Sequence, residues 1–116
     1  MHNCGQQWER HAERFLTGRG LSVVARNFRV GCGEIDLIMR DDTQLVFIEV
    51  RYRSAGRFGD AAATVGPRKQ HRITQCAAAF LHANPTWSDY PCRFDVIAYD
   101  ARQSGTSPRW VRAAFE

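Results

Sequence analysis

Two acidic residues stand inside apolar runs of this 116-residue chain, and their chemistry is the first clue to its function. Asp36 is flanked by isoleucine and leucine, and Glu49 by isoleucine and valine. A carboxylate buried in a strand is costly unless something cationic compensates it. Divalent cations take carboxylate oxygens as ligands, and a metal held by acids can activate water and offset charge on a phosphodiester. The two acids therefore predict a metal-binding, nucleolytic site.

The two acids belong to segments that we expect to form a β-hairpin, over residues 34–39 and 45–52. A two-residue loop at Asp42-Thr43 and a four-residue loop around it give the same register, with Asp36 opposite Glu49 and Glu34 opposite Arg51. An odd-length loop would break this register. Like charges directly opposed destabilise a strand pair, and a bound cation would turn that repulsion into coordination.

Other readings of these acids stay open. A single acid in a strand is usually exposed or paired with arginine, so Glu34 and Arg51 could be an ordinary cross-strand salt bridge. Glu9 is a third candidate for the site. Helical spacing of Trp8 and its apolar neighbours predicts a helix over residues 5–17. Glu9 lies at the margin of its apolar stripe, where it could reach the sheet or be an ordinary boundary glutamate.

A basic segment follows the hairpin, within a chain of net charge +4. Between residues 51 and 72 there is one acid, Asp60, against six bases: Arg51, Arg53, Arg57, Arg68, Lys69 and Arg72. Such a segment favours a polyanionic partner such as nucleic acid, although a solvated basic surface accounts for the charge equally well. Three of these bases fall in the first turns of a predicted helix, where the macrodipole disfavours cations and backbone N–H groups favour a phosphate.

The remaining pattern predicts a single α/β domain spanning residues 1–116. We expect a strand over 21–28, a mobile loop over 54–66, a helix from Pro67 to Asn84, a strand over 93–99 and a last strand over 110–115. Apolar residues make up 44% and charged residues 24% of the chain, as in ordinary globular proteins.

Several classes of protein are disfavoured. The four cysteines are scattered, with no CxxC pair and no Cys/His cluster, which argues against structural zinc. The first residues contain no apolar signal core, and the longest apolar run is too short to cross a bilayer. We therefore expect free thiols, no membrane partner and a cytoplasmic location.

These residues resemble the YraN family of uncharacterised bacterial proteins, placed in the restriction-endonuclease-like PD-(D/E)xK superfamily. The resemblance covers nearly the whole chain. It is carried by GEIDLI at 33–38 and FIEVRYR at 47–53, with GxxxE at 5–9, NF at 27–28, FG at 58–59, KQ at 69–70, RFDV at 93–96 and AF at 114–115. The two longer blocks at this separation are specific together, whereas a lone D…ExK pattern is weak.

The resemblance implies a central mixed β-sheet flanked by helices, with an αβββαβ core, and a nuclease that uses Mg²⁺ or Mn²⁺. Asp36, Glu49 and the backbone carbonyl of Val50 would bind the metal, and Glu9 would assist. Arg51 stands where the superfamily has lysine. Arginine cannot lose its proton in a protein, so Arg51 cannot be a general base, although it could hold the scissile phosphate or stabilise its charge.

Two function classes therefore lead. The first is a metal-dependent endonuclease acting on DNA, whose phosphates would be held by Arg53, Arg57, Arg68, Lys69 and Arg72. Analogy with other small members of the superfamily suggests branched or processed DNA as its substrate. The second is a nucleic-acid-binding or partner-binding module with a silent site, which Arg51 favours. A scaffold without a nucleic-acid role is a weaker third. Symmetric duplex cleavage would require a homodimer, and no dimer surface is legible in the sequence.

Overall fold

The computed structural model describes residues 4–31, 33–53, 65–100 and 107–115. In chain order the elements are α1 (Cys4–Thr17), β1 (Ser22–Val30), β2 (Gly33–Asp41), β3 (Gln44–Arg53), α2 (Pro67–Ala83), the short 3₁₀ helix η2 (Pro85–Trp87), β4 (Cys92–Asp100) and β5 (Arg109–Phe115). Each helix and strand expected from the sequence is present. The loop predicted over 54–66 lies outside the described residues, apart from its last two positions.

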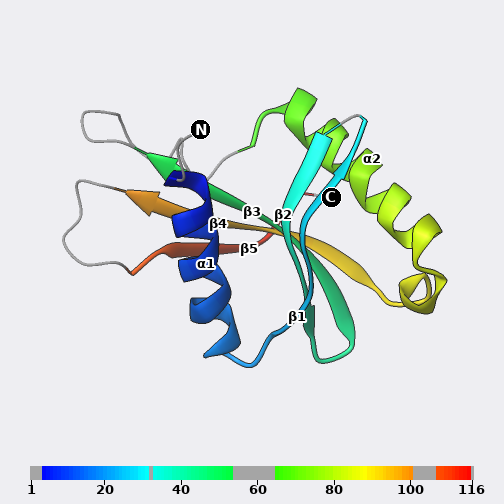
Figure 1. Ribbon diagram of the computed structural model, residues 1–116, viewed down its shortest axis with the longest axis horizontal. Coiled ribbons are helices and arrows are strands. Elements are labelled where there is room, and N and C mark those ends of the chain that lie inside the picture. The colour runs from blue at the N-terminus through cyan, green and yellow to red at the C-terminus, as the bar shows by residue number, and fades with distance from the viewer. Residues whose placement is uncertain (1–3, 32, 54–64, 101–106, 116) are drawn as a thin grey trace.

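The strands form one mixed sheet in the order β1-β2-β3-β4-β5. Neighbouring strands are antiparallel except β3 and β4, which are parallel. A parallel pair needs a crossover connection, and α2 supplies it. Helix α1 covers one face of the sheet and α2 the other (Figure 1). This arrangement confirms the predicted α/β, restriction-endonuclease-like class, with β5 added at the edge.

The two faces of the sheet carry separate apolar cores, which explains why the central strands are apolar on both sides. Under α1, the buried residues are Ala12, Leu16, Leu21, Leu37, Met39, Val46, Ile48, Ile97 and Tyr99. Under α2, they include Ile35, Ile38, Phe47, Ile73, Cys76, Ala77, Phe80 and Val96. No helix among the described residues is long and apolar enough to span a membrane.

The β2–β3 hairpin turns at Asp42-Thr43, with Asp42 in the left-handed conformation at φ 57°. Its ladder runs from the Asp41–Gln44 pair to the Leu37–Ile48 pair, in the predicted register. Beyond that pair the strands part. β2 stays paired with β1 as far as Gly33, and β3 stays paired with β4 as far as Arg53. Figure 1 shows β2 and β3 together at their turn and diverging away from it. The sheet therefore opens into a fork next to Asp36 and Glu49.

A third buried acid, Asp95 in β4, has a structural task. It is 1% exposed and accepts hydrogen bonds from Arg93 Nε at 3.0 Å, Trp110 Nε1 at 2.9 Å and the Ala113 N–H at 3.0 Å. The Arg93 guanidinium also pairs with Asp41 at 2.9 Å. Asp95 thereby ties β5 and the β2–β3 hairpin to β4, and its acceptor sites are used within the fold.

We expect Asp95→Asn to lower the free energy of unfolding by about 3 kcal/mol, because it removes one of the two carboxylates paired with Arg93 and places an amide N–H among the donors that Asp95 accepts from. Urea denaturation measures this change. Asp89→Asn, at an exposed position, is the matched control and should stay within about 0.5 kcal/mol of wild type. Equal stability of the two variants would contradict the role given to Asp95.

Candidate metal centre

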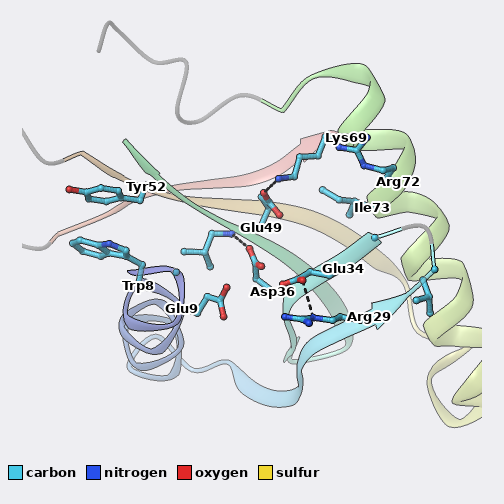
Figure 2. A pocket seen from close by; sticks show the side chains of 15 residues that line it. Trp8, Glu9, Arg29, Glu34, Asp36, Glu49, Tyr52, Lys69, Arg72 and Ile73 are labelled. Carbon is cyan, nitrogen blue, oxygen red and sulfur yellow. Dashed lines mark hydrogen bonds and ion pairs between the residues drawn. The ribbon is translucent and has the colours of Figure 1, made fainter. Parts of the chain in front are cut away.

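The fork in the sheet opens into a cavity of ≈ 640 Å³, lined by residues of α1, β1, β2, β3 and α2. Its size lies within the range of small-ligand sites, about 300–1,000 Å³. Four acids line it, Glu9, Glu34, Asp36 and Glu49, together with three cations, Arg29, Lys69 and Arg72. Figure 2 shows the acids gathered between the two helices, with Lys69 and Arg72 reaching in from α2.

Asp36 stands where β2 leaves β3. Its Oδ2 accepts the Val50 N–H at 2.8 Å, so a side chain takes the place of the backbone acceptor that the parted strand no longer offers. Burial, and next the charge of Glu49, raise the pKa of Asp36 to about 8; the Val50 N–H acts in the opposite direction. At neutral pH and without a metal, this carboxyl therefore holds a proton.

Glu9 reaches the sheet from α1. Its Oε1 accepts a hydrogen bond from Asn27 Nδ2 at 2.8 Å. Asn27 has φ 49°, a left-handed conformation that asparagine adopts more readily than most residues. Both the charge of Glu9 and a hydrogen bond that its carboxylate accepts from the protonated Asp36 further raise the pKa of Asp36. Glu9 is thus a neighbour of Asp36, as its place on the apolar margin of the helix indicated.

Glu34 differs from expectation. The predicted pair with Arg51 does not form as a ladder pair, because the strands have already separated at this level. Glu34 is instead the ladder partner of Arg29 on the neighbouring strand β1, and the two side chains form a salt bridge at 3.1 Å. Carboxylate oxygens of Glu9, Glu34 and Asp36 all lie within 4.8 Å of one another. An all-oxygen set of this kind fits a hard cation such as Mg²⁺ or Mn²⁺.

Glu49 is compensated differently from Asp36. It is 7% exposed, and its Oε2 lies 2.8 Å from Lys69 Nζ. Lys69 was predicted to hold a phosphate, and the structure places it on an acid of the site. The ladder stops one pair short of Asp36 and Glu49, so the two are not a cross-strand pair. They nevertheless line one cavity, and the charge of Glu49 acts on Asp36.

Val50 and Arg51 occupy different places relative to the cavity. Val50 lines it and gives its N–H to Asp36; a metal contact through its carbonyl stays a prediction. Arg51 is half-buried, and the alternation of β3 puts it on the Glu49 face. It is absent from the described residues that line the cavity, so its catalytic role stays a prediction.

The predicted phosphate-binding residues are also divided. Arg72 is exposed and lines the cavity beside Lys69, whereas Arg68 is exposed on α2 and does not belong to the described lining. Arg53 ends β3, but its side chain falls outside what the structure describes. Arg57 lies outside the described residues altogether. Among the described residues, the basic segment therefore contributes only its C-terminal part, Lys69 and Arg72, to the lining of the cavity.

Two members of the site, Glu34 and Lys69, could have been identified from the sequence. Glu34 and Asp36 are two positions apart in one strand, a spacing that puts side chains on one face. Lys69 is the single lysine among sixteen basic residues, which marks it in a chain that otherwise uses arginine. The long-range approach of Lys69 to Glu49 depends on how α2 packs, and no local pattern shows it.

Comparison with known proteins agrees with the resemblance. The model of the uncharacterised protein family UPF0102 matches residues 8–99. A UPF0102 protein of Pseudomonas entomophila is 46% identical over 114 residues, covering 97% of this chain and 93% of its own length. One of Klebsiella pneumoniae is 48% identical over 112 residues (96% and 84%), and one of Ralstonia nicotianae is 53% identical over 116 residues (96% and 85%). These names state no activity. The chain belongs to the uncharacterised protein family UPF0102.

Proposed function

We propose that this protein is a divalent-metal-dependent nuclease that hydrolyses phosphodiester bonds in DNA. The observation that supports this most strongly is Asp36, a carboxyl buried among three other acids in a cavity that also presents cations. Its raised pKa marks a group whose charged form needs a cation. A cytoplasmic location and a homodimer acting on duplex DNA remain predictions.

In this proposal Glu9, Glu34 and Asp36 hold Mg²⁺ or Mn²⁺, with Glu49 beside them. The bound metal would activate water and offset the charge that builds on the phosphate. The protein's own part is to position these oxygens and to bring cations to the substrate. Arg72 is exposed at the cavity wall, where it can pair with a phosphate of the strand.

In this proposal Lys69 takes the role that the superfamily motif gives to the lysine at position 51, where this chain has Arg51. Its Nζ holds Glu49 at 2.8 Å, whereas Arg51 is not part of the described lining. The lysine is 44% exposed as a side chain, so its charge is available both to Glu49 and to a phosphate entering from solvent. We infer that Lys69, rather than Arg51, is the main cation of the site.

The first test is metal-dependent cleavage. A screen of duplex, single-stranded, flap and four-way DNA with Mg²⁺ or Mn²⁺ should find a cleaved substrate, and Asp36→Asn should reduce the rate by more than about 100-fold, because it removes a charged ligand. Glu9→Gln should also reduce it. The matched controls are Asp42→Asn, in the exposed turn, and Glu13→Gln, one helical turn from Glu9 and paired with Arg26. Cleavage that survives in Asp36→Asn at the control rate would contradict the proposal.

The second test compares three basic residues, Lys69, Arg68 and Arg51. We expect Lys69→Met to reduce kcat by about 100-fold or more, because Glu49 loses its counter-charge and the site loses a cation. Arg68→Met, the adjacent exposed position on α2, should have a small effect that appears in KM. Arg51→Ala and Arg51→Lys should both retain more activity than Lys69→Met. If Arg51→Ala is the most damaging of these variants, the main cation is Arg51.

The third test concerns pH. Without metal, the folded protein binds a proton at Asp36 up to about pH 8, whereas the unfolded chain releases it near 3.8. The stability that this proton contributes is complete below the unfolded value and is lost as the pH rises through the folded one. In chelator at about pH 9, Asp36→Asn should therefore exceed wild type by at least about 1 kcal/mol, or about 4 °C in thermal unfolding.

Asparagine keeps an oxygen for the Val50 N–H, so the comparison isolates the charge. Asp42→Asn should retain the pH dependence of wild type. Added Mn²⁺ should raise the melting temperature of wild type and not that of Asp36→Asn, because only the wild type can exchange a proton for the metal. If the stability of wild type and of Asp36→Asn changes with pH in the same way, folding does not raise the pKa of Asp36, and this prediction is wrong.

A silent binding module is the second candidate function. The observation that favours it is the Lys69–Glu49 pair, which already neutralises one of the predicted metal ligands. Calorimetric titration with Mn²⁺ distinguishes the two functions. Heat of binding in wild type that disappears in Asp36→Asn supports the nuclease, whereas no binding in either protein, together with salt-sensitive DNA binding, supports the module.

A further inference from the structure

We propose that the stacked side chains of Trp8 and Tyr52 form a platform for an unpaired nucleobase beside the metal centre, so that the substrate strand is single-stranded at the site of cleavage. This inference rests on the proposed nuclease function. It adds a substrate class that the acids and cations alone do not specify.

The platform joins two distant parts of the chain. Trp8 comes from the first turns of α1 and Tyr52 from the end of β3, and their ring centroids lie 4.7 Å apart with an interplanar angle of 17°. On the sheet side, the Trp8 ring also packs on Tyr99 with a centroid distance of 4.6 Å, and the Tyr99 hydroxyl is hydrogen-bonded to His11. Tyr99 therefore supports the Trp8 ring, and the Trp8 ring in turn supports the Tyr52 ring and limits its movement.

Tyr52 is unusually open for a large aromatic side chain. It is 46% exposed, whereas Tyr99, its neighbour on β4 that also contacts Trp8, is 2% exposed. A flat ring supported by a second ring, with an accessible surface, suits a nucleobase because every base has a π face and can stack without sequence preference. Packing within the fold accounts for the positions of the Trp8 and Tyr99 rings, but it does not account for the exposed surface of the Tyr52 ring.

The position of the platform fits one strand of nucleic acid. Trp8 and Tyr52 line the same cavity as Asp36 and Glu49. In Figure 2 the two rings lie on one side of the acids, and Arg29 and Arg72 lie on the other. A phosphate at the acids would thus have an aromatic surface on one side for its base and cations on the other for the continuing backbone.

Intact duplex DNA cannot use such a platform, because the faces of its bases are covered by their neighbours and must be unstacked at a cost of a few kcal/mol. A single strand, a flap or a frayed end presents bases that are already free to stack. The geometry therefore favours these substrates over continuous duplex.

The test measures binding in the cleavage-deficient Asp36→Asn background, by fluorescence anisotropy with a short oligothymidine strand and with a blunt hairpin duplex. The variants are Tyr52→Leu, which covers Trp8 without offering a ring, and the matched control Tyr52→Phe, which keeps the ring. We expect Tyr52→Leu to weaken single-strand binding by about 5- to 150-fold and Tyr52→Phe to stay within about twofold. Duplex binding and the salt dependence should not change, because the platform carries no charge.

A strand containing the fluorescent base 2-aminopurine supplies a second measurement. Its emission should be quenched on binding to the parent and to Tyr52→Phe, and not to Tyr52→Leu. Equal single-strand affinity of Tyr52→Leu and Tyr52→Phe, an equal loss toward duplex and single strand, or no DNA binding by the parent would each overturn the platform.

The two proposals can fail separately. If metal-dependent cleavage is found but its preference for single-stranded substrates is unaltered in Tyr52→Leu with Asp36 restored, the platform is wrong and the nuclease stands. If no DNA is cleaved with any metal while Tyr52→Leu still loses single-strand binding, the nuclease is wrong and the base platform is supported as part of a binding module.

Discussion

The hydrogen bond from the Val50 N–H to Asp36 marks the constraint on which the site depends. β2 and β3 pair near their turn and then part, because each continues along a different neighbour, β1 or β4. A parted strand exposes backbone groups that need partners. Asp36 satisfies one of them with its side chain, and it is thereby drawn into the interior of the fork. The same separation creates the cavity, so the opening of the sheet and the burial of the acid have a single cause.

Four acids line one cavity, two of them buried (Asp36 and Glu49), and each is compensated differently. Glu34 faces Arg29, Glu49 faces Lys69, and Glu9 accepts a hydrogen bond from Asn27. Asp36 has the Val50 N–H, which only partly offsets burial and the neighbouring charges. Compensation is thus nearly complete at the edges of the cavity and weakest at its centre. A cation held in the proposed site would therefore compensate most at that centre.

The helices and strands could be predicted from local patterns, whereas the central mixed sheet flanked by helices was implied by the family resemblance. Apolar spacing located both helices, alternation and turn residues located the strands, and Asp42-Thr43 determined the hairpin register. The same register also implied Asp36–Glu49 and Glu34–Arg51 pairs, which the ladder does not contain, because no local signal shows where two strands stop pairing. That limit depends on the competing partners β1 and β4, which are long-range. The site was predictable in part, since Asp36, Glu49 and Glu9 converge, whereas the contact of Lys69 with Glu49 requires knowledge of how α2 packs.

The energetics of Asp36 also bear on the choice between an active and a silent site. An acid that must be protonated to be tolerated lowers stability at neutral and higher pH relative to a neutral isostere. A module that only binds nucleic acid has no use for this carboxyl, so asparagine, which avoids the cost of its ionisation, would serve better there. Proteins retain destabilising groups where function needs them, and in the proposed function this carboxylate is needed to bind a cation. The Lys69–Glu49 pair does not weaken this argument, because a lysine beside a metal-binding acid can also serve an incoming phosphate. The buried carboxyl of Asp36 therefore supports the proposed nuclease over a silent site.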